Sequence, residues 1–500
     1  MSSVFDKYTS AQTLSKIVDY PTVADMWAHS VKTYPNNIAI VDRGEYTYLA
    51  LDEEVAKFRT VLKNHGVKLG DRVGIYIPNG IDFVKAFLAI TTLGAVAVLM
   101  PPHLDEVTVF GCSLKFSLSA LVYDNTLSAK LGMLKEKNPA VVTVASDETA
   151  EDQTDTVCVD TNSPCAILFT GGTTGKSKGA LLSHRAVMRG AKNGCYGVWD
   201  VFEQRIFLVL PLTHVFGLIR NMLTSLYTGS TLYICSNNKD MFREIAVFKP
   251  TVLVLVPALA EMALNLSKQF GKNLLGNDIK YIICGASTVA PYLVTEYHNI
   301  GVTLLPGYGL TESANLVSGN PEALKKPDSV GFIYPGMDYK IVDGELCLKG
   351  VNMMDGYIGE DESAIVYDEE GYFKTGDLVR IDEEGFLYIT GRKKEIIVLS
   401  SGENVSPAEV EAKFYAIDGI QDCLVYELGG VLALEILPRV AVLKAKGIQD
   451  VEAYIKEQVQ TVNPTLPPFA QISKIIIRDK DFVRSPSMKI LRGQQNNDKN

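Results

Sequence analysis

The sequence predicts an α/β protein, with a large N-terminal domain of mostly parallel sheets flanked by helices, a small β-rich subdomain, and a small α+β C-terminal domain. Three observations predict this. Between residues 36 and 110, and again between 203 and 311, strand-like apolar runs alternate with helical patterns, which is typical of βαβ units. From residue 328 to 390 the runs are shorter and carry Gly and Asp turns. After residue 391 a new pattern of helices and strands begins.

The length and composition are those of a large globular protein. Five hundred residues suggest about three domains, and 47% apolar with 21% charged residues is a globular balance. A net charge of −10 argues against a nucleic-acid partner. The longest apolar stretch, residues 86–100, is interrupted by Thr and Gly, so it predicts a buried helix and strand rather than a transmembrane segment. The first residues do not resemble a leader peptide, and we expect a cytoplasmic protein.

The eight cysteines are scattered along the chain, with no Cys-x-x-Cys pair and no His at zinc-finger spacing. We therefore expect them to be reduced and mostly buried. A catalytic cysteine is the alternative, but no local pattern supports it.

In the first part of the chain the expected elements follow one another closely. Strands are expected at residues 38–41 and 73–77, and helices at residues 51–65 and 80–93. Residues 146–163 are rich in Asp, Glu and Thr and poor in apolar residues, so they are expected to form an exposed connection.

The most informative stretch is a loop rich in Gly, Thr and Lys that follows an expected buried strand at residues 166–169. Three glycines let its backbone pass close to a ligand, and its amides, hydroxyls and two ammonium groups favour a polyanion such as a nucleoside triphosphate. A Walker A loop is disfavoured, because that motif needs Gly where Thr170 stands. A plain surface turn is the alternative for this loop taken alone. The loop consists of Thr170, Gly171, Gly172, Thr173, Thr174, Gly175, Lys176, Ser177 and Lys178.

The alternation continues beyond residue 203, with a helix expected at residues 215–227. Strands are expected at residues 205–210, 252–256, 281–284 and 302–305.

A second signal is the hexapeptide that runs from Gly307 to Glu312, directly after the last of these strands. Tyr308, between Gly307 and Gly309, can lie flat against a base; the Thr311 hydroxyl can bond a phosphate, and the Glu312 carboxylate can hold Mg²⁺. A strand-end turn with a capping Thr is the alternative.

A third and a fourth signal are Asp377, in a stretch from Tyr372 to Leu378, and Arg392 after Gly391. A carboxylate can accept two hydrogen bonds from ribose hydroxyls, and an arginine can donate to the same sugar or to a phosphate. A turn Asp and a surface Arg are the alternatives.

The C-terminal part forms a unit of its own in the sequence pattern. Helices are expected at residues 407–415 and 450–461, and strands at 423–427 and 475–478. These residues are enough for a small separate domain, so the charged stretch 391–395 can serve as a hinge.

The order and spacing of the four signals resemble those of the adenylate-forming, or AMP-binding, superfamily. That family includes acyl- and aryl-CoA synthetases, adenylation domains of peptide synthetases, and beetle luciferases. The likeness runs from Thr47 to Lys489, nearly the whole chain. It implies a two-step reaction. A carboxylate attacks the α-phosphate of Mg-ATP to give acyl-AMP and pyrophosphate, and a thiol then displaces AMP to give a thioester.

The resemblance also implies roles by position. The loop from residue 170 to 178 would hold the β- and γ-phosphates. Tyr308 would stack on adenine, Thr311 would contact phosphate and Glu312 would ligate Mg²⁺. Asp377 and Arg392 would bind ribose, and Gly285, Ala286 and Ser287 would pass beneath the adenine and the acyl pocket.

The family also has a C-terminal lysine that bonds the reacting carboxylate and the α-phosphate, and here this lysine is Lys489. The usual pattern places Gly before it, where this chain has Met488. The resemblance implies two domains, 1–391 and a mobile 392–500, that turn relative to each other near Lys394 between the two steps. Many relatives have a lysine near Val398 that this chain lacks, in the segment that lines the thiol tunnel.

The acid is indicated by residues 211–218, which resemble the substrate motif of fatty- and aryl-acid CoA synthetases. The candidate catalytic residues are thus Lys489, His214 and Thr311. Mostly apolar or small residues at 211–222, 284–287 and 307–317 favour a small hydrophobic carboxylic acid. We predict an acid–CoA ligase that uses ATP, Mg²⁺ and coenzyme A. The alternatives are an acyl-AMP ligase that loads a carrier protein, and a weakly catalytic nucleotide-binding homologue.

Overall fold

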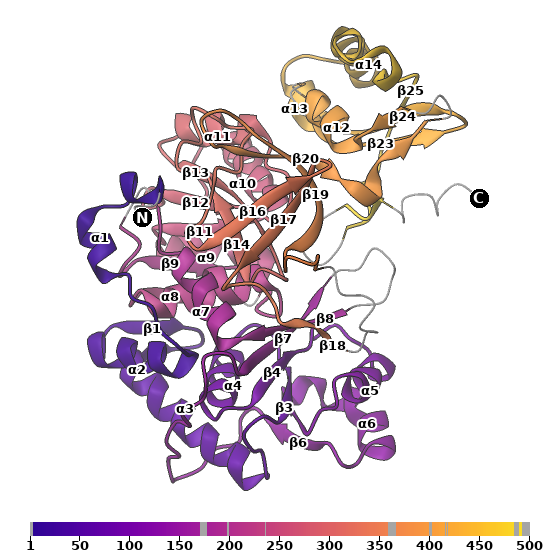
Figure 1. Cartoon of the computed structure of the whole chain (residues 1–500). Coiled ribbons are helices and arrows are strands. Elements are labelled where there is room, and N and C mark those ends of the chain that lie inside the picture. The colour runs from indigo at the N-terminus through magenta and orange to yellow at the C-terminus, as the bar shows by residue number, and fades with distance from the viewer. Residues whose placement is uncertain are drawn as a thin grey trace.

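The computed structural model describes residues 4–170, 178–197, 200–235, 237–358, 367–399, 403–415, 417, 419–484 and 490–492. Two large sheets and a smaller one form the body of the molecule, and a C-terminal unit stands above one side of the body (Figure 1). The predicted α/β class is confirmed: the two large sheets are mostly parallel and flanked by helices.

The first sheet has seven strands, six of them from the early part of the chain. They are β3 Arg72–Tyr76, β4 Val96–Leu99, β5 Ala120–Tyr123, β6 Val142–Ala145, β7 Pro164–Thr170, β8 Lys178–Ser183 and β18 Gly356–Ile358. The order is β18-β8-β7-β4-β3-β5-β6. From β6 to β7 the strands are parallel, whereas β8 is antiparallel to both of its neighbours. A late strand thus completes an early sheet.

The second sheet has nine strands and is parallel in its middle. The strands are β1 Ile38–Val41, β2 Glu45–Thr47, β9 Arg205–Leu208, β10 Thr231–Ile234, β11 Val252–Leu255, β12 Tyr281–Cys284, β13 Thr303–Leu310, β14 Asn315–Gly319 and β15 Phe332–Ile333. The order is β15-β14-β13-β12-β11-β9-β10-β1-β2. All the strands expected between residues 203 and 311 therefore lie in one sheet.

Helices fill the space between and around the sheets because their apolar faces need cover. They include α2 Val23–Thr33, α3 Tyr48–Asn64, α4 Ile81–Thr92, α7 His184–Asn193, α8 Thr224–Tyr227, α9 Met241–Phe248, α10 Pro257–Phe270 and α11 Pro291–Asn299. One hydrophobic core takes in Leu99 of the first sheet and Phe207 of the second, with Phe87 of α4. Helix α7 contacts β7 and β8 of the first sheet and β14 of the second, so it joins the two.

The helix predicted at residues 215–227 forms, but its first two turns are wider than predicted. Residues Phe216–Leu223 form a π-helix, labelled η3, and α8 continues it. A π segment is rare and often marks a functional site. No simple sequence pattern predicts one.

A four-stranded antiparallel sheet follows, as the short runs after residue 328 predict. Its strands are β16 Met337–Val342, β17 Glu345–Gly350, β19 Phe373–Ile381 and β20 Leu387–Arg392, in the order β16-β17-β19-β20. Residues 146–163, expected as an exposed connection, contain no helix or strand and are mostly exposed.

The C-terminal unit has its own core, around Phe414, Leu434 and Ile455. Its elements are α12 Pro407–Tyr415, β23 Ile420–Leu428, β24 Val431–Pro438, α13 Val440–Ala445, α14 Val451–Val462 and β25 Lys474–Ile477. The two predicted helices and two predicted strands are present, whereas β24 and α13 were not predicted. Strand β24 lies between β23 and β25.

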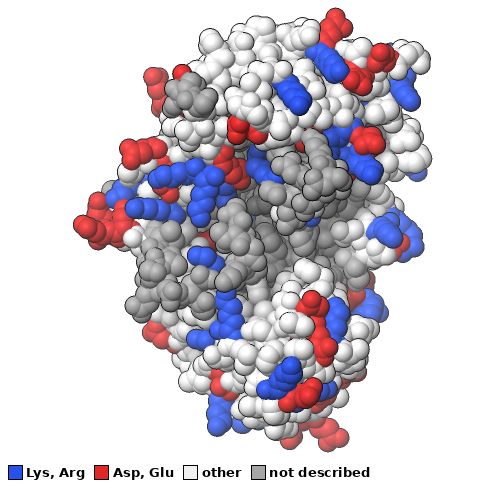
Figure 2. All heavy atoms as spheres, turned by 90° about the vertical axis from the view of Figure 1, so that its right-hand side faces the viewer, with Lys and Arg blue, Asp and Glu red and all other residues white. Residues whose placement is uncertain are grey.

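The eight cysteines are all free, and seven of them are buried, as predicted; Cys158 is exposed. Acidic and basic side chains lie interspersed on the face shown in Figure 2. Among the described residues, no helix combines the length and the apolar character that crossing a membrane requires.

One arginine joins the C-terminal unit to the body. Arg439, just after β24, pairs with Glu261 of α10 and donates to the hydroxyl of Tyr292 in α11. Its guanidinium also lies 4.7 Å from the centre of the Tyr292 ring. The side chains of Arg439 and Glu261 are only 11% and 15% exposed, so removing one partner of this pair costs more stability than breaking an ordinary surface pair.

Replacing Arg439 with glutamine is therefore expected to loosen the C-terminal unit. Losing a charge-assisted contact should raise the population of the open form on the order of tenfold, and with it the rate of tryptic cleavage at Lys393 and Lys394. Lys456→Gln, which breaks an exposed pair within α14, is the matched control. Equal cleavage rates in both variants would show that Arg439 does not hold the unit in place.

Candidate functional site

The glycine-rich loop connects two paired strands. Thr170, the last residue of β7, lies opposite Lys178, the first residue of β8, so the two ends of the loop are held side by side. Lys178 places its ammonium nitrogen 4.9 Å from the centre of the Tyr357 ring. The predicted phosphate-binding residues Gly171, Gly172, Thr173, Thr174, Gly175 and Lys176 lie outside the described residues, as does Lys489.

Tyr357 connects this loop to Glu312. It lies on β18, opposite Ala180 of β8, and its hydroxyl donates to Oε1 of Glu312 at 2.7 Å. Burial raises the pKa of the Tyr357 hydroxyl, and Glu312 raises it further, so the hydroxyl stays protonated and keeps donating. Glu312 and Lys178 thus share one aromatic neighbour, although 134 positions separate them in the sequence.

The turn that carries Thr311 and Glu312 is tightly constrained. Ala314 and Asn315 both have positive φ, +48° and +84°, which is unusual for residues other than glycine. A Cβ on Gly309 would lie 1.6 Å from the carbonyl oxygen of Asn315, so only glycine fits there. Such strain concentrates at functional sites. The Thr311 hydroxyl is partly exposed and has no partner among the described residues, so it is free to meet a ligand.

A buried carboxylate lies beside the same turn. Asp377 on β19 is 2% exposed, and its two oxygens have different partners. Oδ2 accepts from the Tyr308 hydroxyl at 2.5 Å, and Oδ1 pairs with Nε of Arg392 on β20 at 2.8 Å. A carboxylate offers about four lone-pair sites, which is the chemistry that sugar hydroxyls need. The structure therefore brings together the predicted base-binding tyrosine and the two predicted ribose-binding residues.

The protonation state of this trio is fixed by its surroundings. Burial raises the pKa of the Tyr308 hydroxyl well above its ordinary value, and the charge of Asp377 raises it further. Burial alone would lower the pKa of Arg392, but Asp377, together with Tyr308, Glu395 and Glu312, outweighs this and raises it. At neutral pH Tyr308 is therefore a neutral phenol and Arg392 a charged guanidinium, and Asp377 accepts hydrogen bonds from both.

The segment Gly285-Ala286-Ser287 follows β12, and its first residue lies against the start of the hexapeptide. A Cβ on Gly285 would lie 2.8 Å from the carbonyl oxygen of Gly307 and 3.7 Å from the tip of the Phe216 ring. Ala286 adopts a left-handed conformation, with φ +69°. This segment therefore joins the hexapeptide to the π-helix.

His214 lies in a loop before the π-helix, and hydrogen bonds fix the conformation of this loop. Its Nδ1 accepts from the backbone N–H of Phe216 at 3.3 Å. Asn79 fixes the same loop, because its side chain donates to the carbonyl of Leu210 at 2.8 Å and accepts from the N–H of Leu212 at 2.9 Å. Asn79 belongs to none of the four sequence signals, and only the Pro78-Asn79-Gly80 turn marks it.

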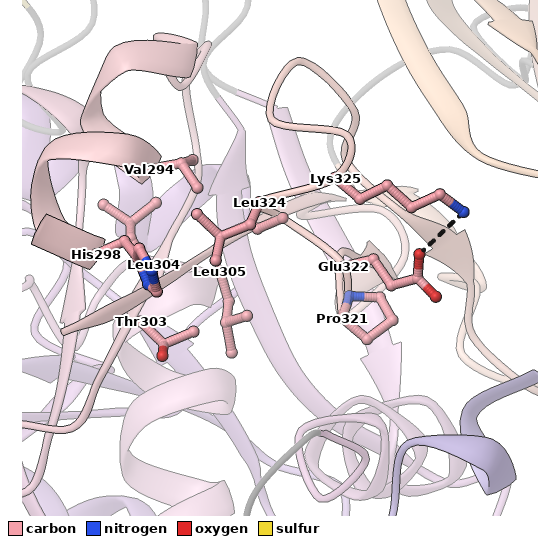
Figure 3. A pocket seen from close by; sticks show the side chains of 10 residues that line it. Val294, His298, Thr303, Leu304, Leu305, Pro321, Glu322, Leu324 and Lys325 are labelled. Carbon is pink, nitrogen blue, oxygen red and sulfur yellow. Dashed lines mark ion pairs between the residues drawn. The ribbon is translucent and has the colours of Figure 1, made fainter. Parts of the chain in front are cut away.

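The cavity shown in Figure 3 is separate from the predicted site residues. It has a volume of about 270 Å³ and is lined by α11, the first half of β13 and the chain around Leu324. Its lysine, Lys325, pairs with Glu322 and with Glu384. None of the predicted site residues lines it; those on β13 begin at Gly307, in the second half of the strand.

The residues present fit a magnesium ion that is held mainly by phosphates. Among the described residues no group of three or more His, Cys, Asp or Glu side chains could enclose a metal ion. Mg²⁺ at a nucleotide site characteristically uses one or two carboxylates together with substrate phosphates and water. Glu312 offers such a carboxylate, since its second oxygen has no described partner.

Comparison with known proteins agrees with this geometry. The family model described as AMP-binding enzyme matches residues 27–358, and the model of the AMP-binding enzyme C-terminal domain matches residues 394–498. The medium-chain fatty-acid–CoA ligase of Escherichia coli K12 is 27% identical over 433 residues, covering 78% of this chain and 75% of that protein.

Two further similar proteins cover most of the chain. A long-chain-fatty-acid–CoA ligase of Escherichia coli O6:H1 is 29% identical over 465 residues, which are 81% of this chain and 82% of that protein. The crystal structure of an anthranilate CoA ligase in complex with anthranoyl-AMP has a TM-score of 0.84 at 20% identity, covering 96% of this chain and 97% of that one. This structural likeness establishes the fold.

Proposed function

The chain belongs to the AMP-binding enzyme family, and on that basis we propose that it is an ATP-dependent acid–CoA ligase. It activates a fatty or aryl acid as acyl-AMP, with release of pyrophosphate, and then forms the acyl-CoA thioester. The observation that carries the proposal is the meeting of Tyr308, Asp377 and Arg392 beside the turn that bears Glu312. The curated relatives reported above are fatty-acid–CoA ligases.

In the first step, a carboxylate oxygen of the acid attacks the α-phosphorus of ATP, and the bond to pyrophosphate breaks. Asp377 and Arg392 hold the ribose and Tyr308 covers the adenine, so the α-phosphate is fixed in position. Thr311 and the loop from residue 170 to 178 bind the phosphates, and Lys489 bonds the oxygens where negative charge develops. Glu312 would hold Mg²⁺, which would supply positive charge against the phosphates.

In the second step, a thiolate attacks the acyl carbon and AMP leaves. We propose that the thiol belongs to CoA and that residues 392–500 form a domain that turns near Lys394 to admit it. His214 lies between the carboxylate and the body of the acid, whose pocket is formed by the π-helix and by Gly285, Ala286 and Ser287. The cytoplasmic location expected from the sequence stays a prediction.

The test is ATP–pyrophosphate exchange with a panel of fatty, aryl and amino acids, followed by addition of CoA to the best acid. Exchange with one class of acid, and then CoA-dependent release of AMP, would establish the ligase. Exchange without turnover of CoA would indicate a carrier-protein thiol instead. No exchange with any acid would refute the proposed activity.

Replacing Lys394 with proline is expected to spare acyl-AMP formation and to slow thioester formation, because only the second step needs the turn. Proline fixes φ and removes the backbone N–H, so it limits rotation at this residue. Lys394→Ala removes the same side chain without this constraint and serves as the control. The two half-reactions are measured by pyrophosphate exchange and by thioester yield from preformed acyl-AMP. Equal losses in both would argue against a turning domain.

A further inference from the structure

The π-helix carries a buried cation without a counter-ion. Arg220 is 5% exposed, and among the described residues it has no ion pair and no hydrogen bond. The one other buried arginine among the described residues is satisfied: Arg59, 4% exposed, donates to the carbonyl of Thr154 at 2.7 Å and to the Thr92 hydroxyl at 3.0 Å. An unpaired buried charge is costly, so a bare guanidinium at this depth calls for an explanation.

Unpaired buried amide groups lie on the π-helix and on two elements that pack against it, α7 and β14. Both side-chain polar atoms of Asn221, next to Arg220, lack partners, as do Oδ1 of Asn193 and Nδ2 of Asn315. These three asparagines are 0–5% exposed. Buried amides are nearly always hydrogen-bonded in folded proteins. The nitrogens of Arg220 are not among the fully enclosed unpaired atoms, so its head group keeps a small accessible surface.

These groups come from three elements that meet at one point. A Cβ on Gly190 of α7 would lie 2.2 Å from the carbonyl oxygen of Ala314 and 3.0 Å from a methyl group of Ile219. Arg220 follows Ile219 on the π-helix and Asn315 follows Ala314, while Asn193 lies near the end of α7 and donates to the carbonyl of Leu316 at 3.3 Å. The polar groups thus gather where α7, η3 and β14 pack together.

This place adjoins the proposed acid site. Because hydrogen bonds in a π-helix join residues five apart, residues four apart lie on nearly the same side. Arg220 therefore follows Phe216 along the helix face, and the ring of Phe216 lies beside Gly285. His214 stands at one end of this face and Arg220 lies further in, so an extended acid whose reacting carboxylate is near His214 would point its far end toward Arg220.

The side chain remains a cation there. Burial lowers the pKa of the Arg220 guanidinium, and the described groups that act on its charge are Tyr334 and Cys195, which are neutral at pH 7. Arginine stays protonated in proteins. Residues 211–222, mostly apolar or small in composition, therefore also include a buried cation.

We propose that Arg220 binds a second carboxylate on the acid substrate, so that the preferred substrate is a dicarboxylic acid joined to the thiol at one end only. The inference rests on the proposed ligase function and names its substrate class. A planar guanidinium matches a carboxylate with two parallel hydrogen bonds. Bound substrate would also give the nearby amide donors an acceptor. A monocarboxylic acid of the same length would leave the cation buried and unpaired.

The test compares monocarboxylic and dicarboxylic acids of matched length, aliphatic and aromatic, in ATP–pyrophosphate exchange. The wild-type protein is expected to prefer the dicarboxylic member by about 10- to 100-fold in kcat/KM, the value of hydrogen bonds to a charged group. Arg220→Met should abolish or reverse this preference, and Arg220→Lys should retain part of it. A wild-type preference for monocarboxylic acids, unchanged in Arg220→Met, would overturn the inference and leave the ligase function intact.

Stability distinguishes a ligand-binding arginine from a structural one. Replacing an unpaired buried charge with an apolar side chain of similar volume should leave Tm unchanged or raise it. Arg59→Met is the matched control and should lower Tm, because it removes two hydrogen bonds. An equal fall in Tm in Arg220→Met would overturn the inference. A dicarboxylic acid alone should raise the Tm of the wild-type protein but not that of Arg220→Met. This measurement tests binding at Arg220 even if no acid supports exchange and the ligase proposal fails.

Discussion

Replacing Lys489 with alanine is expected to lower the rate of acyl-AMP formation on the order of 10²-fold or more. In the proposed first step, negative charge builds up on the oxygens around the α-phosphorus. A fixed ammonium group there stabilises the transition state more than the bound substrates, so its loss lowers kcat rather than only raising KM. The measurement is ATP–pyrophosphate exchange with the best acid, at saturating ATP and acid.

The exposed lysine Lys480, nine residues earlier, provides the matched control. Lys480→Ala should leave the exchange rate within about twofold of the wild-type rate, as usual for a surface change. Thioester formation from preformed acyl-AMP should be much less affected by Lys489→Ala, because no pyrophosphate leaves in that step. Near-normal exchange in Lys489→Ala would show that this lysine does not act in the site. The departure from the family pattern at Met488 would be consistent with that result.

The second large effect is expected from Asp377→Asn, which should raise the KM for ATP about 10- to 100-fold. An asparagine has the same shape as aspartate, but it loses the charge that strengthens hydrogen bonds from ribose hydroxyls. It also leaves Arg392 without its anion. Because Arg392 is 46% exposed, water can replace part of that contact, and the loss of stability should be small compared with the loss of binding.

The control for this change is Asp368→Asn. Asp368 lies just before β19 and pairs with Lys340 at 2.8 Å, away from the proposed nucleotide site. Binding of ATP is followed by calorimetry and unfolding by a thermal melt, so that affinity and stability are measured separately. If Asp377→Asn binds ATP as the wild-type protein does, Asp377 has only a structural role with Tyr308 and Arg392.

Much of the fold could be predicted because local pattern decides it. The strand β1 and the helix α4 follow from runs of apolar residues whose spacing is visible within a dozen positions, and both form within a few residues of the predicted bounds. Strand β24 was not predicted, although it lies between two strands that were. Its run Val431–Pro438 follows the Gly429-Gly430 turn that closes a hairpin with β23.

The site was harder to predict, because its contacts join distant parts of the chain. Tyr308, Asp377 and Arg392 could be named from motifs, but the hydrogen bond between Tyr308 and Asp377 spans 69 positions. Tyr357 was missed altogether, since its neighbours in the sequence carry no signal and only the pairing of β18 with β8 brings it to Glu312. The lack of an ion-pair partner for Arg220 among the described residues could not be predicted either, because a sequence identifies a charged residue but does not show which side chains surround it in the fold.

The pairing of β18 with β8 also bears on how the protein is made. Until residue 358 leaves the ribosome, β8 is the unpaired edge of a sheet that is otherwise complete by residue 183. A bare strand edge invites pairing with other chains, and large proteins fold domain by domain during synthesis. The nascent chain therefore carries an exposed edge beside the glycine-rich loop during synthesis of the seven strands of the second sheet that follow β8, an interval of at least 170 residues. At a typical elongation rate this lasts on the order of ten seconds or more, which makes this edge a natural point for chaperone protection.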